Sequence, residues 1–262
     1  MNDGYIFLDK TLPLIEEKKK EYRTEKKPKQ KDRSYYVPGK NGKSFARRKD
    51  REIRQILDNY TDRALYEAFL ITGVSQFESF LMDVLTLVIK EYPRKLSTTI
   101  PGVSATKDVP LDLLLESSSV EDVVTEVIDR HLSALMYGKP RVYLDYAGKV
   151  AGFDTTDKAF DKYVEIKATR DLIIHNSAVA NEVYLQKAGK LSRGALGATL
   201  PVNKEYYHHC MAVFKRLSGI IKRDTTKAYP VRKTKPIQDN SNGAKASTEA
   251  LAQPSALPSA PE

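Results

Sequence analysis

The chain has 262 residues, of which 41% are hydrophobic and 29% charged, and its net charge at pH 7 is +9. This length suffices for one well-packed domain or two small ones. No run approaches the roughly 18 uninterrupted apolar residues of a membrane-spanning helix, and no basic segment followed by an apolar core predicts a secretory signal. We therefore expect a cytoplasmic protein without membrane contact.

Cys210 is the only cysteine. A single thiol excludes an internal disulfide and a multi-cysteine zinc site. His208 and His209 are adjacent, so on a helix they face different directions. We expect no metal and no other cofactor.

Basic residues gather in two segments. Residues 18–51 hold fifteen Lys or Arg against four acids, a charge of +11, and residues 222–236 hold six against one, a charge of +5, so the rest of the chain sums to −7. Basic segments attract polyanions through counterion release, and aromatic rings among them can stack on unpaired bases. The alternative is a solvated, partly disordered arm. The side chains expected to contact RNA are Lys26, Lys27, Lys29, Tyr35, Tyr36, Arg47 and Arg48.

The N-terminal part, residues 1–49, is predicted to be a basic arm with a short helix and at most a hairpin at residues 35–45. From about 50 to 92 the pattern is helical, because apolar side chains recur at steps of three and four. Gly73 inside this helix predicts a close helix–helix approach or a bend, and Pro93 ends it. The repeating positions are Phe69, Gly73, Phe77, Leu81, Leu85 and Val88.

A connection follows at residues 94–117, with a short helical piece at 111–116. Ser118 and Glu121 then form a capping-box pattern, which predicts the start of a valine-rich helix. Gly138 ends that helix.

Three more helices are predicted in the second half of the chain. One covers residues 141–151 and is closed by Gly152. The next is capped by one of residues 154–156 and continues into the segment 168–179. The last covers about 202–223 and carries one apolar face, made of Tyr207, Cys210, Phe214, Leu217 and Ile221.

No convincing strand alternation is present, so the fold class is all-α. The body is an all-helical domain at residues 50–224. Residues 225–262 are a basic and then disordered tail rich in Pro, Ser and Ala, because its last part cannot bury enough apolar surface to fold.

The segment 168–179, "ATRDLIIHNSAV", places Arg170, Asp171 and His175 among aliphatic residues. On a helical wheel of about 100° per residue, Asp171 falls on a face that is otherwise dry, where an unpaired carboxylate costs several kcal/mol. Lys167 at i−4 and His175 at i+4 are candidate partners. One interpretation is therefore a Lys–Asp–His ladder at a helix end. The same wheel assigns Glu165 and Thr169 to solvent.

The string "RDLIIHNSAVANEVYL" also resembles the signature of HEPN domains (higher eukaryotes and prokaryotes nucleotide-binding), especially the ribonuclease-like branch of bacterial toxins and phage-defence proteins. Arg170 matches the motif Arg, Asp171 the polar position, His175 the motif His and Asn176 its follower. The position of Ala178 is often Gly in such sequences. Val179, Tyr184 and Leu185 match the continuation, and residues 77–93 resemble the first core helix of that branch.

This resemblance implies a HEPN-like helical bundle that forms a homodimer, with the motif helices of two protomers facing each other across a groove. It implies a catalytic set of Arg170, His175, Asp171 and Asn176. His175 would act as general base or acid, and Arg170 would stabilise charge on the phosphate. Asp171 would orient His175, and Asn176 would position the motif or contact RNA.

Three functions fit these observations. The first is a metal-independent endoribonuclease that uses the 2′-hydroxyl of RNA as nucleophile, in a toxin or phage-defence role that implies a possible neutralising protein partner. The second is a non-catalytic HEPN-like module that binds RNA, a nucleotide or a partner protein. The third is a helical scaffold. Glu78 and Asp83 are interpreted as the solvated edge of the helix at 50–92.

Overall fold

The computed structural model describes residues 2–21, 33–39, 42–105 and 108–230. Among the described residues, helices account for 74% and strands for 7%, which confirms the all-α class. The strands β1 (Arg33–Gly39) and β2 (Gly42–Arg48) pair as an antiparallel hairpin. The α-helices are α1 (Asn2–Glu21), α2 (Asp50–Asn59), α3 (Leu65–Glu91), α4 (Leu111–Glu116), α5 (Val120–Met136), α6 (Pro140–Ala151), α7 (Lys158–Asn176), α8 (Glu182–Ala188) and α9 (Lys204–Ala228).

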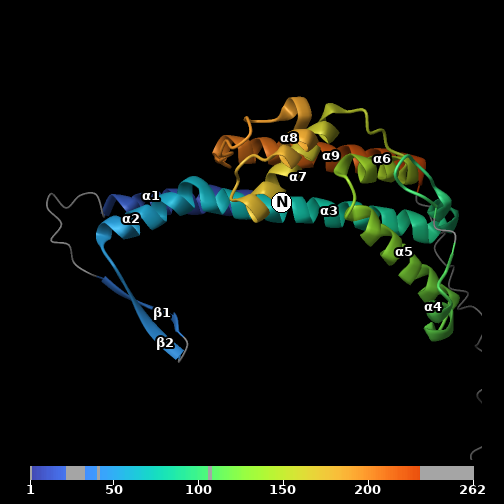
Figure 1. Ribbon diagram of the computed structural model, residues 1–262, viewed down its shortest axis with the longest axis horizontal. Helices are drawn as coiled ribbons and strands as arrows, with labels where there is room; N and C mark the ends of the chain where they lie inside the picture. Colours follow the sequence, from blue (N-terminus) through green and yellow to red (C-terminus); the bar gives the residue numbers. More distant parts are fainter. Residues whose placement is uncertain (1, 22–32, 40–41, 106–107, 231–262) are drawn as a thin grey trace, which may run out of the picture. The chain divides into compact units, whose positions relative to one another are not determined.

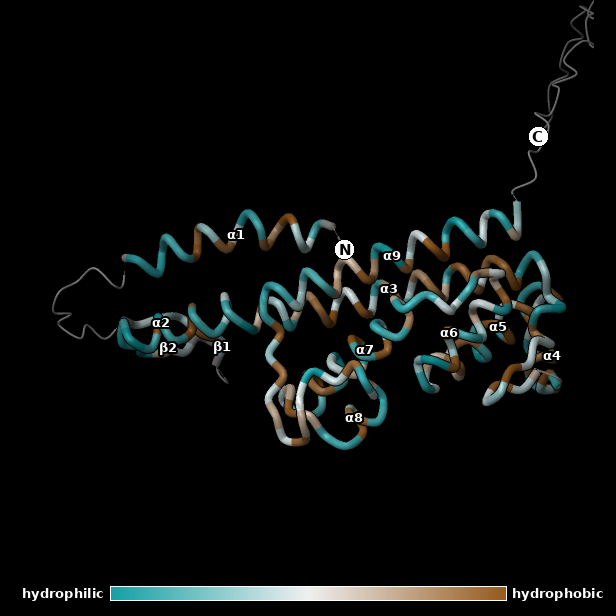
Figure 2. The backbone as a smooth tube through the Cα atoms, turned by 90° about the horizontal axis from the view of Figure 1, so that it is seen from above, coloured by the Kyte–Doolittle hydropathy of each residue, from teal (hydrophilic) through white to brown (hydrophobic). Residues whose placement is uncertain are grey.

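The central element is α3, which α2 joins through a π-helical turn at Tyr60–Ala64. Helices α5, α6, α7 and α9 all contact α3 (Figure 1). The predicted close approach at Gly73 is confirmed, because a Cβ there would lie 3.0 Å from Met211 and 3.1 Å from Phe214 of α9. Figure 2 shows α9 running beside α3. The α3 side chains that are completely buried are Leu70, Val74, Phe77, Leu81, Leu85 and Ile89.

By length and composition alone, the helical stretch Asp50–Glu91 could cross a membrane. A core helix of a soluble protein passes the same test, and the apolar stripe of α3 belongs to the main core. The packing is therefore consistent with a soluble protein.

Two helix caps lie next to the residues predicted for them. The α5 cap is Ser119, whose hydroxyl accepts the amide of Asp122 at 3.1 Å, so the capping pattern is shifted by one residue from Ser118. The α7 cap is Asp157, which accepts the amide of Ala159 at 2.9 Å. The predicted closure of α6 by Gly152 is confirmed, with φ of 78°.

The helical-wheel prediction for α7 is wrong on one side. Glu165 and Thr169 are buried although the wheel assigns them to solvent. Their face is covered by α8 and by the loop at residues 189–203, which extend the helix–helix core with a second apolar cluster. That cluster consists of Ala168, Leu172, Ala180, Tyr184, Ala188 and Leu200.

The N-terminal segment differs from the predicted arm. Residues 2–21 form one helix of 20 residues, α1, and they belong to the same compact unit as the rest of the chain up to Tyr229. Leu8 joins the main core. Lys19 is buried and pairs with Asp58 at 2.8 Å and Glu16 at 2.6 Å. Apolar and ionic contacts therefore hold α1 in place.

The last helix is longer than predicted. Helix α9 ends at Ala228, so residues 225–228 are helical and not part of a tail. Tyr229 then packs its ring against Tyr92 and donates a hydrogen bond to the Val150 carbonyl at 2.6 Å. The remainder of the predicted tail, residues 231–262, lies outside the described residues.

Candidate functional site

A cavity of about 680 Å³ opens between α3, the α5–α6 corner and the second half of α7. We call it the Arg170 cavity. Glu78 and Asp83 both line it; Asp83 is exposed, as expected for the solvated edge of the helix, whereas only 18% of the Glu78 side chain is exposed. Its charged lining is balanced and consists of Lys167, Arg170, Lys187, Glu78, Asp83 and Asp171.

Arg170 is half-buried at the wall of this cavity, with 22% of its side chain exposed. Its Nη1 contacts Asp171 Oδ1 at 3.2 Å, and Lys187 of α8 contacts Asp171 Oδ2 at 3.2 Å. Among the described residues, Arg170 Nε is buried without a hydrogen-bond partner. The guanidinium therefore keeps an unused donor close to the cavity.

Lys167 does not pair with Asp171, as the predicted ladder requires. Its Nζ lies 2.7 Å from Glu78 Oε1 across the α3–α7 contact. The hydroxyls of Tyr143 and Tyr163 are 2.8 Å apart and each lies 3.4 Å from the same Glu78 oxygen. Burial raises the pKa of both tyrosines well above the usual value, so both stay neutral donors.

His175 lies five residues beyond Arg170, in the last turn of α7, and its side chain is exposed. It does not line the Arg170 cavity. The expected contact with Asp171 is absent, because both Asp171 oxygens face Arg170 and Lys187 instead. Within the part of the chain that the structure describes, the His175 side chain has neither a hydrogen bond nor an ion pair. The imidazole is therefore open to an incoming group.

The chain leaves α7 through two consecutive residues in the left-handed region, Ser177 with φ of 50° and Ala178 with φ of 61°. Such angles are uncommon outside glycine. Asn176 donates its side-chain amide to the Val179 carbonyl at 2.6 Å. The Ala178 amide donates to the Leu172 carbonyl at 3.0 Å. Asn176 thus fixes the turn that directly follows His175.

A second polar cluster surrounds a buried carboxylate in the middle of α7. Glu165 accepts hydrogen bonds from the hydroxyls of Tyr184 at 2.9 Å and Tyr206 at 2.7 Å, and from Thr169 at 2.7 Å. It also pairs with Arg193 at 3.2 Å, whose guanidinium lies 3.6 Å from the centre of the Tyr206 ring. Sequence reasoning missed this cluster, because three of its members come from α8, α9 and the loop between them.

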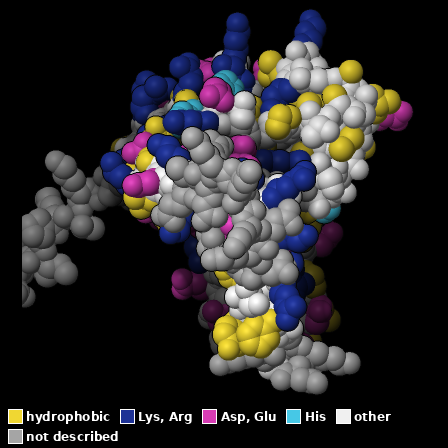
Figure 3. All heavy atoms as spheres, turned by 90° about the vertical axis from the view of Figure 1, so that its left-hand side faces the viewer, with side chains coloured by type: hydrophobic (Ala, Val, Ile, Leu, Met, Phe, Trp, Pro, Cys, Tyr) yellow, Lys and Arg dark blue, Asp and Glu magenta, His cyan; other side chains and the backbone are white. Residues whose placement is uncertain are grey.

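The predicted RNA-binding residues fall into two groups. Lys26, Lys27 and Lys29 lie outside the described residues. Tyr35 and Tyr36 lie on β1 and Arg47 and Arg48 on β2, all exposed. At the lower end of the face in Figure 3, hydrophobic side chains lie next to Lys and Arg side chains.

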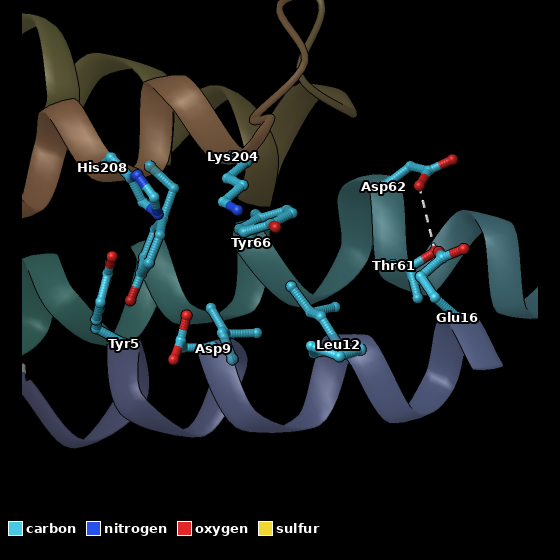
Figure 4. A pocket seen from close by; sticks show the side chains of 12 residues that line it. Tyr5, Asp9, Leu12, Glu16, Thr61, Asp62, Tyr66, Lys204 and His208 are labelled. Atoms are coloured by element: carbon cyan, nitrogen blue, oxygen red, sulfur yellow. Dashed lines mark hydrogen bonds between the residues drawn. The ribbon is translucent and has the colours of Figure 1, made fainter. Parts of the chain in front are cut away.

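A second cavity, of about 340 Å³, lies between α1, the α2–α3 junction and α9. Figure 4 shows Tyr5 and Asp9 of α1 opposite Tyr66 and His208. The rings of Tyr5 and His208 have centroids 5.0 Å apart. This cavity shares no residue with the Arg170 cavity.

Other reactive groups lie away from the Arg170 cavity. Burial raises the pKa of the Cys210 thiol to about 12, so this thiol is a core group and not a nucleophile. Among the described residues, no group of three or more His, Cys, Asp or Glu is placed to hold a metal ion.

Comparison of the chain with models of protein families, with curated proteins and with solved structures finds no match.

Proposed function

We propose that the protein is a metal-independent endoribonuclease of the HEPN type that acts as a homodimer. The observation that carries this proposal is the placement of two motif residues on α7: Arg170 lines an open cavity, and His175 is exposed and without a partner in the described chain.

The chemistry uses the 2′-hydroxyl of RNA as nucleophile. His175 accepts the 2′-hydroxyl proton while the 2′-oxygen bonds to phosphorus. The bond from phosphorus to the 5′-oxygen breaks, the leaving oxygen takes up a proton from water, and a 2′,3′-cyclic phosphate forms. Arg170 donates to the phosphate oxygens as negative charge grows there. To do so, it exchanges its contact with Asp171 for the phosphate.

The geometry of one helix supports the proposed dimer. Arg170 and His175 are five residues apart, which places them about 140° apart around the α7 axis. One helix therefore presents them to different sides. Two α7 helices that face each other bring the Arg170 of one protomer to the His175 of its partner.

The backbone after the motif is also in keeping with the HEPN resemblance. Ala178 stands where such sequences often have Gly, and here its φ is 61°. Glycine is favoured at positive φ because it has no Cβ. Although alanine replaces glycine at this position, the backbone has the positive φ that a glycine would favour.

The test is incubation of the purified protein with single-stranded RNA in EDTA. The parent protein is compared with His175→Ala and with His209→Ala, a matched removal of an exposed histidine from α9. We expect EDTA-resistant cleavage that falls at least about 100-fold in His175→Ala and is unchanged in His209→Ala. Equal cleavage by all three proteins would contradict the proposal.

A non-catalytic module that binds RNA, a nucleotide or a partner protein is the second candidate. The balanced charges of the Arg170 cavity favour it, because every cation there has a carboxylate among the lining residues. Salt-sensitive RNA binding without cleavage would support this candidate. A toxin or phage-defence role, a neutralising protein partner and a cytoplasmic location belong to the same proposal by analogy.

A further inference from the structure

The pairing register of the hairpin defines two faces. In the antiparallel register, Tyr36 lies opposite Phe45 and Ser34 lies opposite Arg47. Because side chains alternate between faces and opposed residues share one, these four residues lie on the same face. We call it the Tyr36 face. Tyr35, opposite Ala46, lies on the other face.

The Tyr36 face exposes a ring pair. Tyr36 is 70% exposed and Phe45 is 60% exposed, and their ring centroids are 4.5 Å apart. In folded proteins large aromatic groups are usually buried, and an exposed pair of them is a common feature of binding surfaces. These rings are held in place by strand pairing and not by a core.

The charge of the hairpin and of its flanking sequence favours an anionic ligand. Arg47 shares the Tyr36 face, and the basic segment 18–51 that contains the hairpin has a charge of +11. Cationic grooves with aromatic platforms are the means by which proteins hold unpaired nucleic acid, since the backbone pairs with the cations and the bases stack on the rings. Bases inside a duplex present no open face to a ring.

We propose that the Tyr36 face binds single-stranded RNA, with one base stacked on the Tyr36–Phe45 pair and a neighbouring phosphate held by Arg47. This inference rests on the proposed function for the identity of the nucleic acid as RNA. It names unpaired RNA as the substrate class and gives the hairpin a role separate from cleavage.

The experiment measures binding of a fluorescein-labelled oligouridylate of about 12 nucleotides by anisotropy. His175→Ala is the background, so that cleavage does not consume the probe. Tyr36→Ser combined with Phe45→Ser should weaken binding about 10-fold, as expected for the loss of one stacked base, with the slope of log affinity against log salt unchanged. Arg47→Gln should weaken binding and reduce that slope by about one.

Tyr60→Ser is the matched control, since it removes one exposed tyrosine from outside the hairpin. It should bind within about twofold of the background protein, and a duplex of the same length should be insensitive to the Tyr36 and Phe45 substitutions. Circular dichroism checks that the variants keep their helical content.

Three results would overturn the inference. One is unchanged oligouridylate binding by the double variant, and another is an equal loss in Tyr60→Ser. The third is a change in dimer dissociation, measured by sedimentation, without a change in RNA affinity, which would assign the ring pair to a second copy of the chain.

The inference and the proposed function can fail separately. Cleavage of a dinucleotide substrate tests the Arg170 and His175 chemistry without the hairpin. If the dinucleotide is not cut but ring-dependent RNA binding persists, the proposed cleavage is wrong and the inference stands. The opposite result is equal cleavage of the dinucleotide by the parent and the ring variant, together with an oligouridylate affinity that is the same with and without the rings. In that case the inference is wrong and the proposed function stands.

Discussion

Lys167 of α7 contacts Glu78 of α3 at 2.7 Å, with only 12% and 18% of the two side chains exposed. This pair links the motif helix to the central helix and leaves Asp171 to Arg170 and Lys187. Glu78→Gln should lower the free energy of unfolding by about 2 kcal/mol, because it leaves a poorly hydrated ammonium unpaired. Urea denaturation measures the loss. Lys167→Met combined with Glu78→Gln should recover part of it, and strictly additive losses would contradict the pairing.

Asp171 is predicted to restrain Arg170 and not to orient His175. Asp171→Asn removes the charge that Arg170 and Lys187 share, so RNA affinity should rise about two- to fivefold, a typical scale for a half-exposed ion pair. The pH dependence of kcat/KM should keep its shape, since no hydrogen bond joins Asp171 to His175 in the described chain. A shifted pH profile would contradict this prediction and support the role implied by the sequence resemblance, in which Asp171 orients His175.

We predict that Glu165 stabilises the second apolar cluster and with it the folded chain. Glu165→Gln weakens its bonds to Tyr184 and Tyr206 and leaves Arg193 without its carboxylate. We expect a loss of about 3 kcal/mol in the free energy of unfolding, with faster amide exchange across residues 182–203. Glu182→Gln on the surface of α8 is the control and should change stability by less than about 0.5 kcal/mol. Similar losses in both variants would argue against a buried hub.

His131 should make the protein sensitive to mild acid. Burial lowers the pKa of His131 from its usual value near 6.5, and its Nε2 lies 2.8 Å from the Tyr146 hydroxyl. The unfolded chain then binds a proton more readily than the folded one, so this contribution to stability is present above about pH 6.5 and is lost as the pH falls through the lower, folded-state pKa. His131→Gln should flatten the decline in the free energy of unfolding between pH 7 and 5. Parallel curves for the two proteins would contradict this.

The parts of the fold that could be predicted are those specified by neighbours on one helix. The apolar spacing of α3 and the glycine at position 73 depend on local periodicity, and both predictions agree with the packing. The buried state of Glu165 could not be predicted in this way. A helical wheel shows only one helix, whereas Glu165 is covered by residues that follow 19 and 28 positions later, Tyr184 and Arg193.

The candidate site shows the same limit. His175 lies in the exposed last turn of α7 and Arg170 lies five residues earlier beside the cavity, and both positions depend on where α7 ends. The partner of Asp171 was mispredicted because Lys187, 16 positions away, approaches it from α8.

The angular separation of Arg170 and His175 around the α7 axis predicts complementation between two inactive variants. If each centre combines the guanidinium of one protomer with the imidazole of its partner, two inactive proteins, Arg170→Ala and His175→Ala, complement each other when mixed. Half of the randomly reassorted dimers are mixed, and each of these carries one intact centre beside one that lacks both groups. Activity should then return to about a quarter of the parental rate. Two groups from the same chain would give no such recovery.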